Sequence, residues 1–391
     1  MIIKIDLPQM RGTLRRAKWI RGSPSPPFHT ILLGTGFIDF QTGVIMQRIS
    51  SAITKMLPLA LTAFAFSNAA IAQNQLTAIK VAQPPKLEAL ASDAAWAKAA
   101  PLTVKLSSGA NFKDGATTVT LKAVYTTDTL YMLVQYDDPT QSVRRSPYVK
   151  QPDGSWKKLV DPDDKGGDNN KYYEDKFAIL WNINNSIKNF DSMGCFALCH
   201  AGEAGKAFGN KYTASEGEIG DIWHMKSIRT GYIGQADDQY VDHTRYDKDK
   251  APEAGRKSDP KTAGGYDDIK LVNGKPEFMS KDGKAANKGG TYYLRAEDKV
   301  PFDDSKFVAG DEVASILVSR FTGDRGDIDA AIGYKDGTWT AALTRKLVTG
   351  SKYDVQFSDL GAQYAFGFAA FDNAQVRHAY HNAPVKLSFA K

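Results

Sequence analysis

The segment Gly194–His200 contains the only two cysteines of the 391-residue chain. Cys195 and Cys199 stand four positions apart, and His200 follows the second directly. Covalent haem attachment needs two thiols, which add to the porphyrin vinyl groups, and an adjacent imidazole, which binds the iron from one face. The usual spacing has two residues between the cysteines, whereas this chain has three. The segment predicts one covalent haem c, with Cys195 and Cys199 as thioether links and His200 as the proximal iron ligand.

Two other interpretations of the cysteines stay open. A Cys195–Cys199 disulfide is possible if the segment is a loop, although residues four apart on a helix suit disulfide geometry poorly. Two thiolates and His200 could also hold a metal ion, but zinc sites usually have a different ligand spacing. The direct Cys-His step favours haem over both alternatives.

A haem iron that transfers electrons usually has a second protein ligand. The segment 220–229, with Asp221 as a cap, predicts a short helix that carries His224 and Met225. Neighbouring residues on a helix point about 100° apart, so only one of the two could face the iron. We expect His224 as the sixth ligand and Met225 as the runner-up. The remaining histidines and methionines downstream of residue 72 are His243, His378, His381, Met132, Met193 and Met279.

A secretory signal peptide is predicted at residues 46–72. A basic stretch precedes an apolar core at residues 56–66, which is too short to span a bilayer. Ala70 and Ala72 are the small residues that a signal peptidase recognises. The mature domain would then comprise residues 73–391, and we expect it in the periplasm or outside the cell, without a transmembrane segment after cleavage.

The positive charge of the chain belongs to its first residues. Residues 1–45 read as an upstream extension from a misplaced start. Residues 1–72 hold eight of the 50 Lys and Arg residues and two of the 44 Asp and Glu residues, which leaves 42 of each in residues 73–391. A formally neutral mature chain gives no reason to expect nucleic-acid binding.

The hydrophobic pattern predicts an all-β fold, a β-sandwich in which long loops and short helices form a haem site. Alternating or continuous apolar runs with turn signals between them favour strands. We predict strands at residues 76–81, 117–125, 130–136, 177–183, 292–295, 313–321, 328–334, 339–347, 364–371 and 385–389.

Two stretches lack this pattern. Residues 201–260 are polar and read as an insertion that a haem would help to pack. The acidic loop at residues 161–168 could bind calcium through clustered oxygen ligands, although a solvated surface loop is favoured. No catalytic triad, paired-carboxylate motif or phosphate-binding loop stands out, so electron transfer is expected rather than catalysis.

Four segments resemble the haem-binding domain of ethylbenzene dehydrogenase-type proteins. They are Tyr173–Ile183, Gly194–His200, Gly220–His224 and Phe366–Asn373. The resemblance implies a β-sandwich. In some members this domain is the γ subunit of a periplasmic molybdenum oxidoreductase and holds haem b through methionine and lysine, while others look like separate c-type cytochromes. The Cys-x-x-x-Cys-His segment makes this chain resemble the c-type cytochromes of the family, which bind haem covalently.

The leading hypothesis is an exported mono-haem c-type cytochrome that passes single electrons to a redox partner protein in a respiratory chain. The resemblance also implies a second possibility, a haem-carrying subunit bound to molybdenum oxidoreductase subunits. A third possibility is a non-haem β-sandwich that binds a ligand and carries a Cys195–Cys199 disulfide.

Overall fold

The computed structural model describes residues 74–391, except residues 165–166, 199–203 and 207–208. The predicted extension and signal peptide therefore lie outside the described residues. Cys199 and His200 do so as well. No helix among the described residues is long and apolar enough to cross a membrane.

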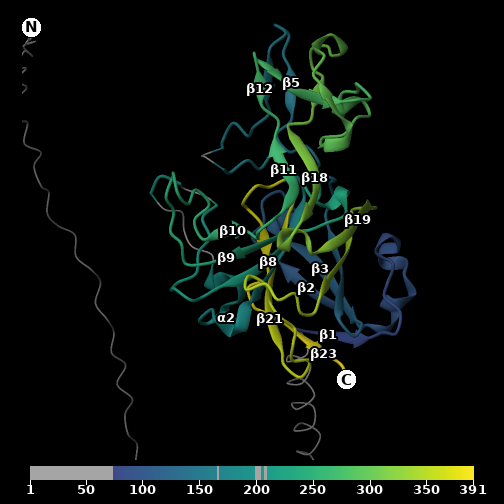
Figure 1. Ribbon diagram of the computed structural model, residues 1–391, viewed down its shortest axis with the longest axis vertical. Coiled ribbons are helices and arrows are strands. Elements are labelled where there is room, and N and C mark those ends of the chain that lie inside the picture. Colours follow the sequence, from purple (N-terminus) through teal and green to yellow (C-terminus); the bar gives the residue numbers. More distant parts are fainter. Residues whose placement is uncertain (1–73, 165–166, 199–203, 207–208) are drawn as a thin grey trace, which may run out of the picture. The chain divides into compact units, whose positions relative to one another are not determined.

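One large sheet of 13 strands organises the domain (Figure 1). Its path runs β10-β9-β8-β7-β21-β23-β1-β3-β4-β20-β19, while β2 pairs with β3 and β22 with β21. The strands of this sheet are β1 (Gln75–Lys80), β2 (Leu102–Leu106), β3 (Thr117–Tyr125), β4 (Thr129–Asp137), β7 (Lys176–Asn182), β8 (Gly220–Lys226), β9 (Asp237–Val241), β10 (Arg256–Ser258), β19 (Asp329–Lys335), β20 (Thr338–Lys346), β21 (Tyr364–Phe371), β22 (Ala379–Tyr380) and β23 (Val385–Phe389).

The sheet curls so that its two halves pack face to face. The largest apolar cluster joins Phe177, Trp181 and Trp223 of β7 and β8 to Met132 and Trp339 of β4 and β20. Every one of these five side chains is at most 1% exposed. The predicted all-β sandwich is therefore confirmed, with its core between the β7–β8–β21 layer and the β3–β4–β20 layer.

Short helices cover the outer faces of both layers. The 3-10 helices Leu87–Ser92 and Ala94–Lys98 bring Trp96 onto the outer face of β3, β4 and β20. On the other layer, α2 (Phe190–Met193) and the 3-10 helix Gly194–Ala197 pack against β7, β8 and β21. This second layer carries the candidate site on its outer face.

A smaller group of strands surrounds separate apolar clusters. These strands are β5 (Tyr148–Lys150), β6 (Trp156–Lys158), β11 (Ala263–Asp268), β12 (Leu271–Val272), β13 (Lys275–Pro276), β14 (Phe278–Ser280), β15 (Leu294–Arg295), β16 (Lys299–Pro301), β17 (Glu312–Val313) and β18 (Ile316–Thr322). Trp156 packs edge-on against Phe302 and Phe307, which stack on each other at 5.3 Å. The predicted strands at residues 292–295 and 313–321 lie in this group.

The helix expected at residues 220–229 is wrong, because residues 220–226 form strand β8 inside the main sheet. Asp221 is therefore not a helix cap. Its carboxylate lies in the core and accepts a hydrogen bond from Arg345 at 2.8 Å. All seven residues of β8 are buried on both faces, so the strand lacks the polar–apolar alternation of a half-buried strand.

The polar stretch at residues 201–260 is likewise not a simple insertion, since it supplies β8, β9 and β10. Several of its acidic residues are buried although the sequence pattern predicts exposure, because they form ion pairs inside the domain. Asp237 contacts both Lys226 and Arg325, and Asp238 lies 3.4 Å from Arg345. Charges with fixed partners can be buried in a strand where the sequence pattern predicts solvent.

Candidate functional site

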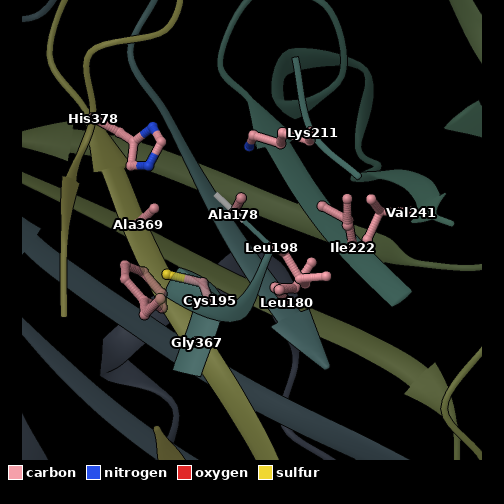
Figure 2. A pocket seen from close by; sticks show the side chains of 11 residues that line it. Ala178, Leu180, Cys195, Leu198, Lys211, Ile222, Val241, Gly367, Ala369 and His378 are labelled. Atoms are coloured by element: carbon pink, nitrogen blue, oxygen red, sulfur yellow. The ribbon is translucent and has the colours of Figure 1, made fainter. Parts of the chain in front are cut away.

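An apolar pocket opens on the outer face of β7, β8, β9 and β21 (Figure 2). It encloses about 420 Å³, including the space at its open mouth. Its lining is largely aliphatic and aromatic, with one thiol, one imidazole and one amine. The lining residues are Ala178, Leu180, Cys195, Leu198, Lys211, Ile222, Val241, Gly367, Phe368, Ala369 and His378. An apolar lining with a few polar groups is typical of sites that hold small molecules or cofactors.

Cys195 is held in the lining by two glycines. Gly194 has a φ of 55°, a left-handed conformation that turns the chain after α2. Gly367 on β21 lies directly beneath, since a Cβ atom at that position would stand 2.8 Å from the Cys195 Cβ. The lack of a side chain at Gly367 therefore lets the cysteine segment approach the sheet closely.

His378 lies in the same lining, although it is far from Cys195 in the sequence (Figure 2). Its Nδ1 is 2.9 Å from the Val376 carbonyl oxygen, which suits an Nδ1–H donor and leaves Nε2 as the ring's lone-pair atom. The preceding residue, Arg377, donates from Nε to both carboxylate oxygens of Asp168 at 3.0 Å. This ion pair anchors the segment that carries the imidazole.

His224 is buried on the same face of the sheet but does not line the pocket. Its Nδ1 lies 2.9 Å from Gln239 Oε1, and its Nε2 has no hydrogen-bond partner among the described residues. Burial, together with nearby Lys226 and Lys176, holds the pKa of His224 well below its ordinary value, so the ring is neutral.

One aromatic ring contacts both imidazoles. Phe371 stacks on His224 with centroids 5.9 Å apart and packs against His378 at 4.8 Å. Lys176 adds a buried amine, with its Nζ 4.1 Å from the Phe371 centroid. Burial and the nearby Arg229 lower the pKa of this lysine well below its usual range.

Met225, the runner-up for the sixth ligand, faces the other side of the sheet. It belongs to the core between the two layers and is 1% exposed. Side chains alternate along a strand, so His224 and Met225 point to opposite faces of β8. Met225 is therefore separated by the sheet from the pocket that holds Cys195.

The acidic loop at residues 161–168 has protein cations as partners. Asp168 pairs with Arg377, and Asp161 lies 3.2 Å from the Lys171 Nζ. Among the described residues, this loop brings no three acidic side chains together as a cation would require. The calcium site considered for this loop gains no support from its geometry.

The sequence signals for His378 and Gly367 were weak. His378 lies near Tyr380 in a short segment that resembles a surface loop, and only the pairing of β22 with β21 carries it to the pocket. Gly367 interrupts an aromatic strand, and such a glycine indicates close backbone approach. That signal pointed to a contact without identifying Cys195 as its partner.

The model of the ethylbenzene dehydrogenase family matches residues 93–383. The chain belongs to the ethylbenzene dehydrogenase family. The match spans every described residue of the pocket, and membership relates the chain to an oxidoreductase system. No curated protein sequence matches the chain.

Solved structures show only remote likeness. A family 9 carbohydrate-binding module from Caldicellulosiruptor kristjanssonii, in complex with glucose, has a TM-score of 0.30 and 8% identity. The same module with cellotriose has a TM-score of 0.30 and 9% identity. Each alignment covers 81% of this chain and 95% of the other. We draw nothing about ligands from likeness at that score.

Proposed function

We propose that this member of the ethylbenzene dehydrogenase family is an exported mono-haem c-type cytochrome. The main observation that supports this proposal is the apolar pocket, because both Cys195 and His378 line it. Cys195 is the first thiol of the Cys-x-x-x-Cys-His segment. Cys195 and Cys199 would hold the haem as thioethers, and His200 would bind its iron. The buried, apolar walls suit a porphyrin face, and the open mouth suits an exposed haem edge.

The second iron ligand in this proposal is His378, in place of His224. His378 lines the pocket, and its Nδ1 contact with a carbonyl oxygen orients the ring and leaves Nε2 to coordinate. His224 also has an Nε2 without a partner among the described residues, but it lies outside the pocket lining. His224 is the alternative ligand.

A bound haem would supply one-electron transfer. The chain's own residues would fix its position, exclude water from its faces through Leu180, Ile222 and Val241, and leave one edge for a redox partner protein. An exported location follows from the predicted signal peptide at residues 46–72. In this proposal the domain carries electrons in a respiratory chain and is not itself catalytic.

The family favours a second candidate function, a haem-carrying subunit of a periplasmic molybdenum oxidoreductase. In that case catalysis takes place in another chain, and this domain relays electrons. Co-purification separates the two: a stable complex with a molybdenum-containing chain supports the subunit, and a monomeric cytochrome supports the separate carrier. The non-haem β-sandwich with a Cys195–Cys199 disulfide is tested by the experiment below.

Covalent attachment is tested by producing the exported protein with cytochrome maturation machinery, denaturing it, and staining the gel for haem. We expect haem to remain on the wild-type chain and to be reduced or lost in Cys195→Ala and Cys199→Ala. A native protein without colour, with a Cys195–Cys199 disulfide found by mass spectrometry, would refute the proposal.

The second ligand is tested by comparing ferric spectra of His378→Ala and His224→Ala. We expect His378→Ala to convert the spectrum from low-spin to high-spin, because the iron loses one strong ligand. His224→Ala is the matched control and should stay low-spin. The reverse pattern would assign the ligand to His224, and Met225→Ala should leave the spectrum unchanged.

A further inference from the structure

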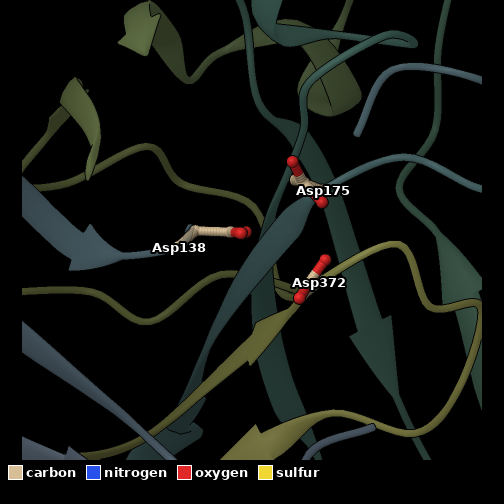
Figure 3. A group of neighbouring side chains, drawn as sticks. All are labelled: Asp138, Asp175 and Asp372. Carbon is tan, nitrogen blue, oxygen red and sulfur yellow. The ribbon is translucent and has the colours of Figure 1, made fainter. Parts of the chain in front are cut away.

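Three aspartates meet where the ends of three strands converge (Figure 3). Asp138 follows β4, Asp175 precedes β7, and Asp372 follows β21. Each offers one carboxylate oxygen, and these oxygens all lie within 4.8 Å of one another. Strand β4 belongs to one layer of the sandwich, whereas β7 and β21 are neighbours in the other. The cluster therefore joins the two layers at one end of the core.

The three carboxylates are removed from water. Asp138 and Asp175 are 0% exposed and Asp372 is 2% exposed. None of them forms an ion pair with a lysine, arginine or histidine in the part of the chain that the structure describes. Gathering three buried acids without a positive charge is costly when they are ionised.

A second aspartate cluster in the same domain shows the contrast. Asp221, Asp238 and Asp354 also lie within 4.8 Å of one another. Arg345 offsets part of their charge, since its Nη1 is 2.8 Å from Asp221, 3.4 Å from Asp238 and 3.8 Å from Asp354. The chain thus supplies its own cation to the second cluster, and the described residues supply none to the first.

Donors on the protein orient the first cluster but leave one oxygen open. Asp175 accepts hydrogen bonds from Ser142 N, Trp339 Nε1 and Asn373 N at 2.5, 3.0 and 2.8 Å. Asp138 Oδ1 accepts from Thr140 N at 3.1 Å.

Asp138 Oδ2, in contrast, is buried and has no hydrogen-bond partner among the described residues. Figure 3 shows this carboxylate directed toward the space shared with Asp175 and Asp372. A buried carboxylate oxygen without a donor, aimed at two further carboxylates, indicates a missing positive ligand.

The buried Tyr136 hydroxyl also has no hydrogen-bond partner among the described residues.

We propose that Asp138, Asp175 and Asp372 bind a calcium ion that ties the two layers of the sandwich together. Calcium prefers carboxylate and carbonyl oxygens and water at 2.3–2.6 Å, so two oxygens on one ion are at most roughly 5 Å apart. The three carboxylate oxygens lie within 4.8 Å of one another, inside that limit. Magnesium keeps several waters, which a buried cluster accommodates poorly. The site is separate from the haem pocket and does not depend on the proposed electron transfer.

Thermal unfolding of the whole exported protein after EGTA treatment, with and without added calcium chloride, tests the site. Calcium at about 100 times its dissociation constant should raise the Tm by roughly 5 °C. Magnesium chloride at the same concentration should have a much smaller effect. An unchanged Tm with calcium, together with no binding in isothermal titration calorimetry, would overturn the proposal.

Two variants locate the ion. Asp138→Asn should abolish the calcium-dependent shift, yet be at least as stable as the wild type in EGTA because it removes one repelling charge. Asp163→Asn is the matched control: Asp163 lies in the acidic loop at residues 161–168, and this variant should keep the full shift. If Asp163→Asn loses the shift and Asp138→Asn keeps it, calcium binds in the loop and the proposal is wrong. Asp372→Asn provides a second test should Asp138→Asn fail to fold.

Discussion

At the scale of single residues, the close approach of the cysteine segment to strand β21 determines where the Cys195 thiol lies. Cys195 reaches the outer face of β21 only because Gly367 has no side chain. The neighbouring Phe366 and Phe368 point into the core between the layers, where each is 0% exposed. A strand that buries large rings on one face and has a glycine on the other gives the cysteine segment room to pack.

Gly367→Ala should destabilise the domain by about 1–3 kcal/mol, because the new methyl group would overlap the Cys195 Cβ and push the segment away. If haem is attached as proposed, its covalent yield should fall as well. Urea unfolding and haem staining measure the two effects. Gly361→Ala, a change at an exposed turn, is the control and should alter both by little. Wild-type haem yield in Gly367→Ala would contradict the close packing described here.

At the scale of elements, buried charges hold the strands that the hydrophobic pattern misses. Arg345 on β20 is 1% exposed and lies between the layers. It contacts Asp221 of β8 and donates to the Val355 carbonyl oxygen at 2.7 Å. Its guanidinium also lies 4.6 Å from the Trp223 ring centroid. One side chain therefore links β8, β20 and the segment before β21.

Arg345→Ala should lower the free energy of unfolding by about 3–5 kcal/mol, because it leaves buried carboxylates without their cation. Denaturant unfolding measures the change. Lys248→Ala removes an exposed ion pair with Asp249 and should cost less than about 1 kcal/mol. Equal effects of the two substitutions would show that the Arg345 network contributes nothing beyond a surface pair.

The same network predicts a pH dependence. Burial and the nearby Asp221 and Asp354 raise the pKa of Asp259 from 3.8 to about 9. Between these values the folded chain holds a proton that the unfolded chain has released, so stability falls as pH rises.

Asp259→Asn should remove this decline. The free energy of unfolding of the variant should rise relative to that of the wild type by up to about 1.4 kcal/mol per pH unit between pH 5 and 9. Urea midpoints measured across that range check the slope. Asp267→Asn, at an exposed position on β11, should follow the wild-type profile. A constant difference between Asp259→Asn and the wild type at all pH values would rule out this titration.

At the scale of the whole molecule, export would change the charge that the protein presents to its partners. The full chain has a formal charge of +6 and a sequence pI near 8.9. Residues 73–391 are formally neutral, since they hold equal numbers of basic and acidic residues. A redox partner would therefore meet local patches of charge rather than a strongly basic protein.

If the chain is exported as proposed, the product should begin at Gln73, because Ala70 and Ala72 are the predicted cleavage signal. N-terminal sequencing of the periplasmic or secreted fraction measures this directly, and isoelectric focusing should place the product well below pI 8.9. Ala72→Arg should block processing, whereas a conservative Ala72→Ser change should preserve it. A cytoplasmic product that starts at Met1 would contradict the predicted leader.

The sequence by itself determined the strands that have a clear apolar pattern. It also supplies the prediction that the Cys-x-x-x-Cys-His segment binds haem. Strands β3, β20 and β23 were predictable because local alternation reports which face is buried, whereas β4 and β21 were predictable as continuous apolar runs. A pair of thiols with a following histidine is also a local feature. Neither inference depends on which distant segments of the chain pack beside these residues.

Only the tertiary structure decided what depends on distant partners. Residues 220–226 are a strand because β7 and β9 pair with them and Arg345 neutralises Asp221. His378 reaches the pocket because β22 returns beside β21. Asp138, Asp175 and Asp372 form a cluster because strands of both layers end at one place. The sequence alone does not show whether a carboxylate or an imidazole lies in a loop, in the core or in a site. Its neighbours in the tertiary structure determine its environment and therefore its role.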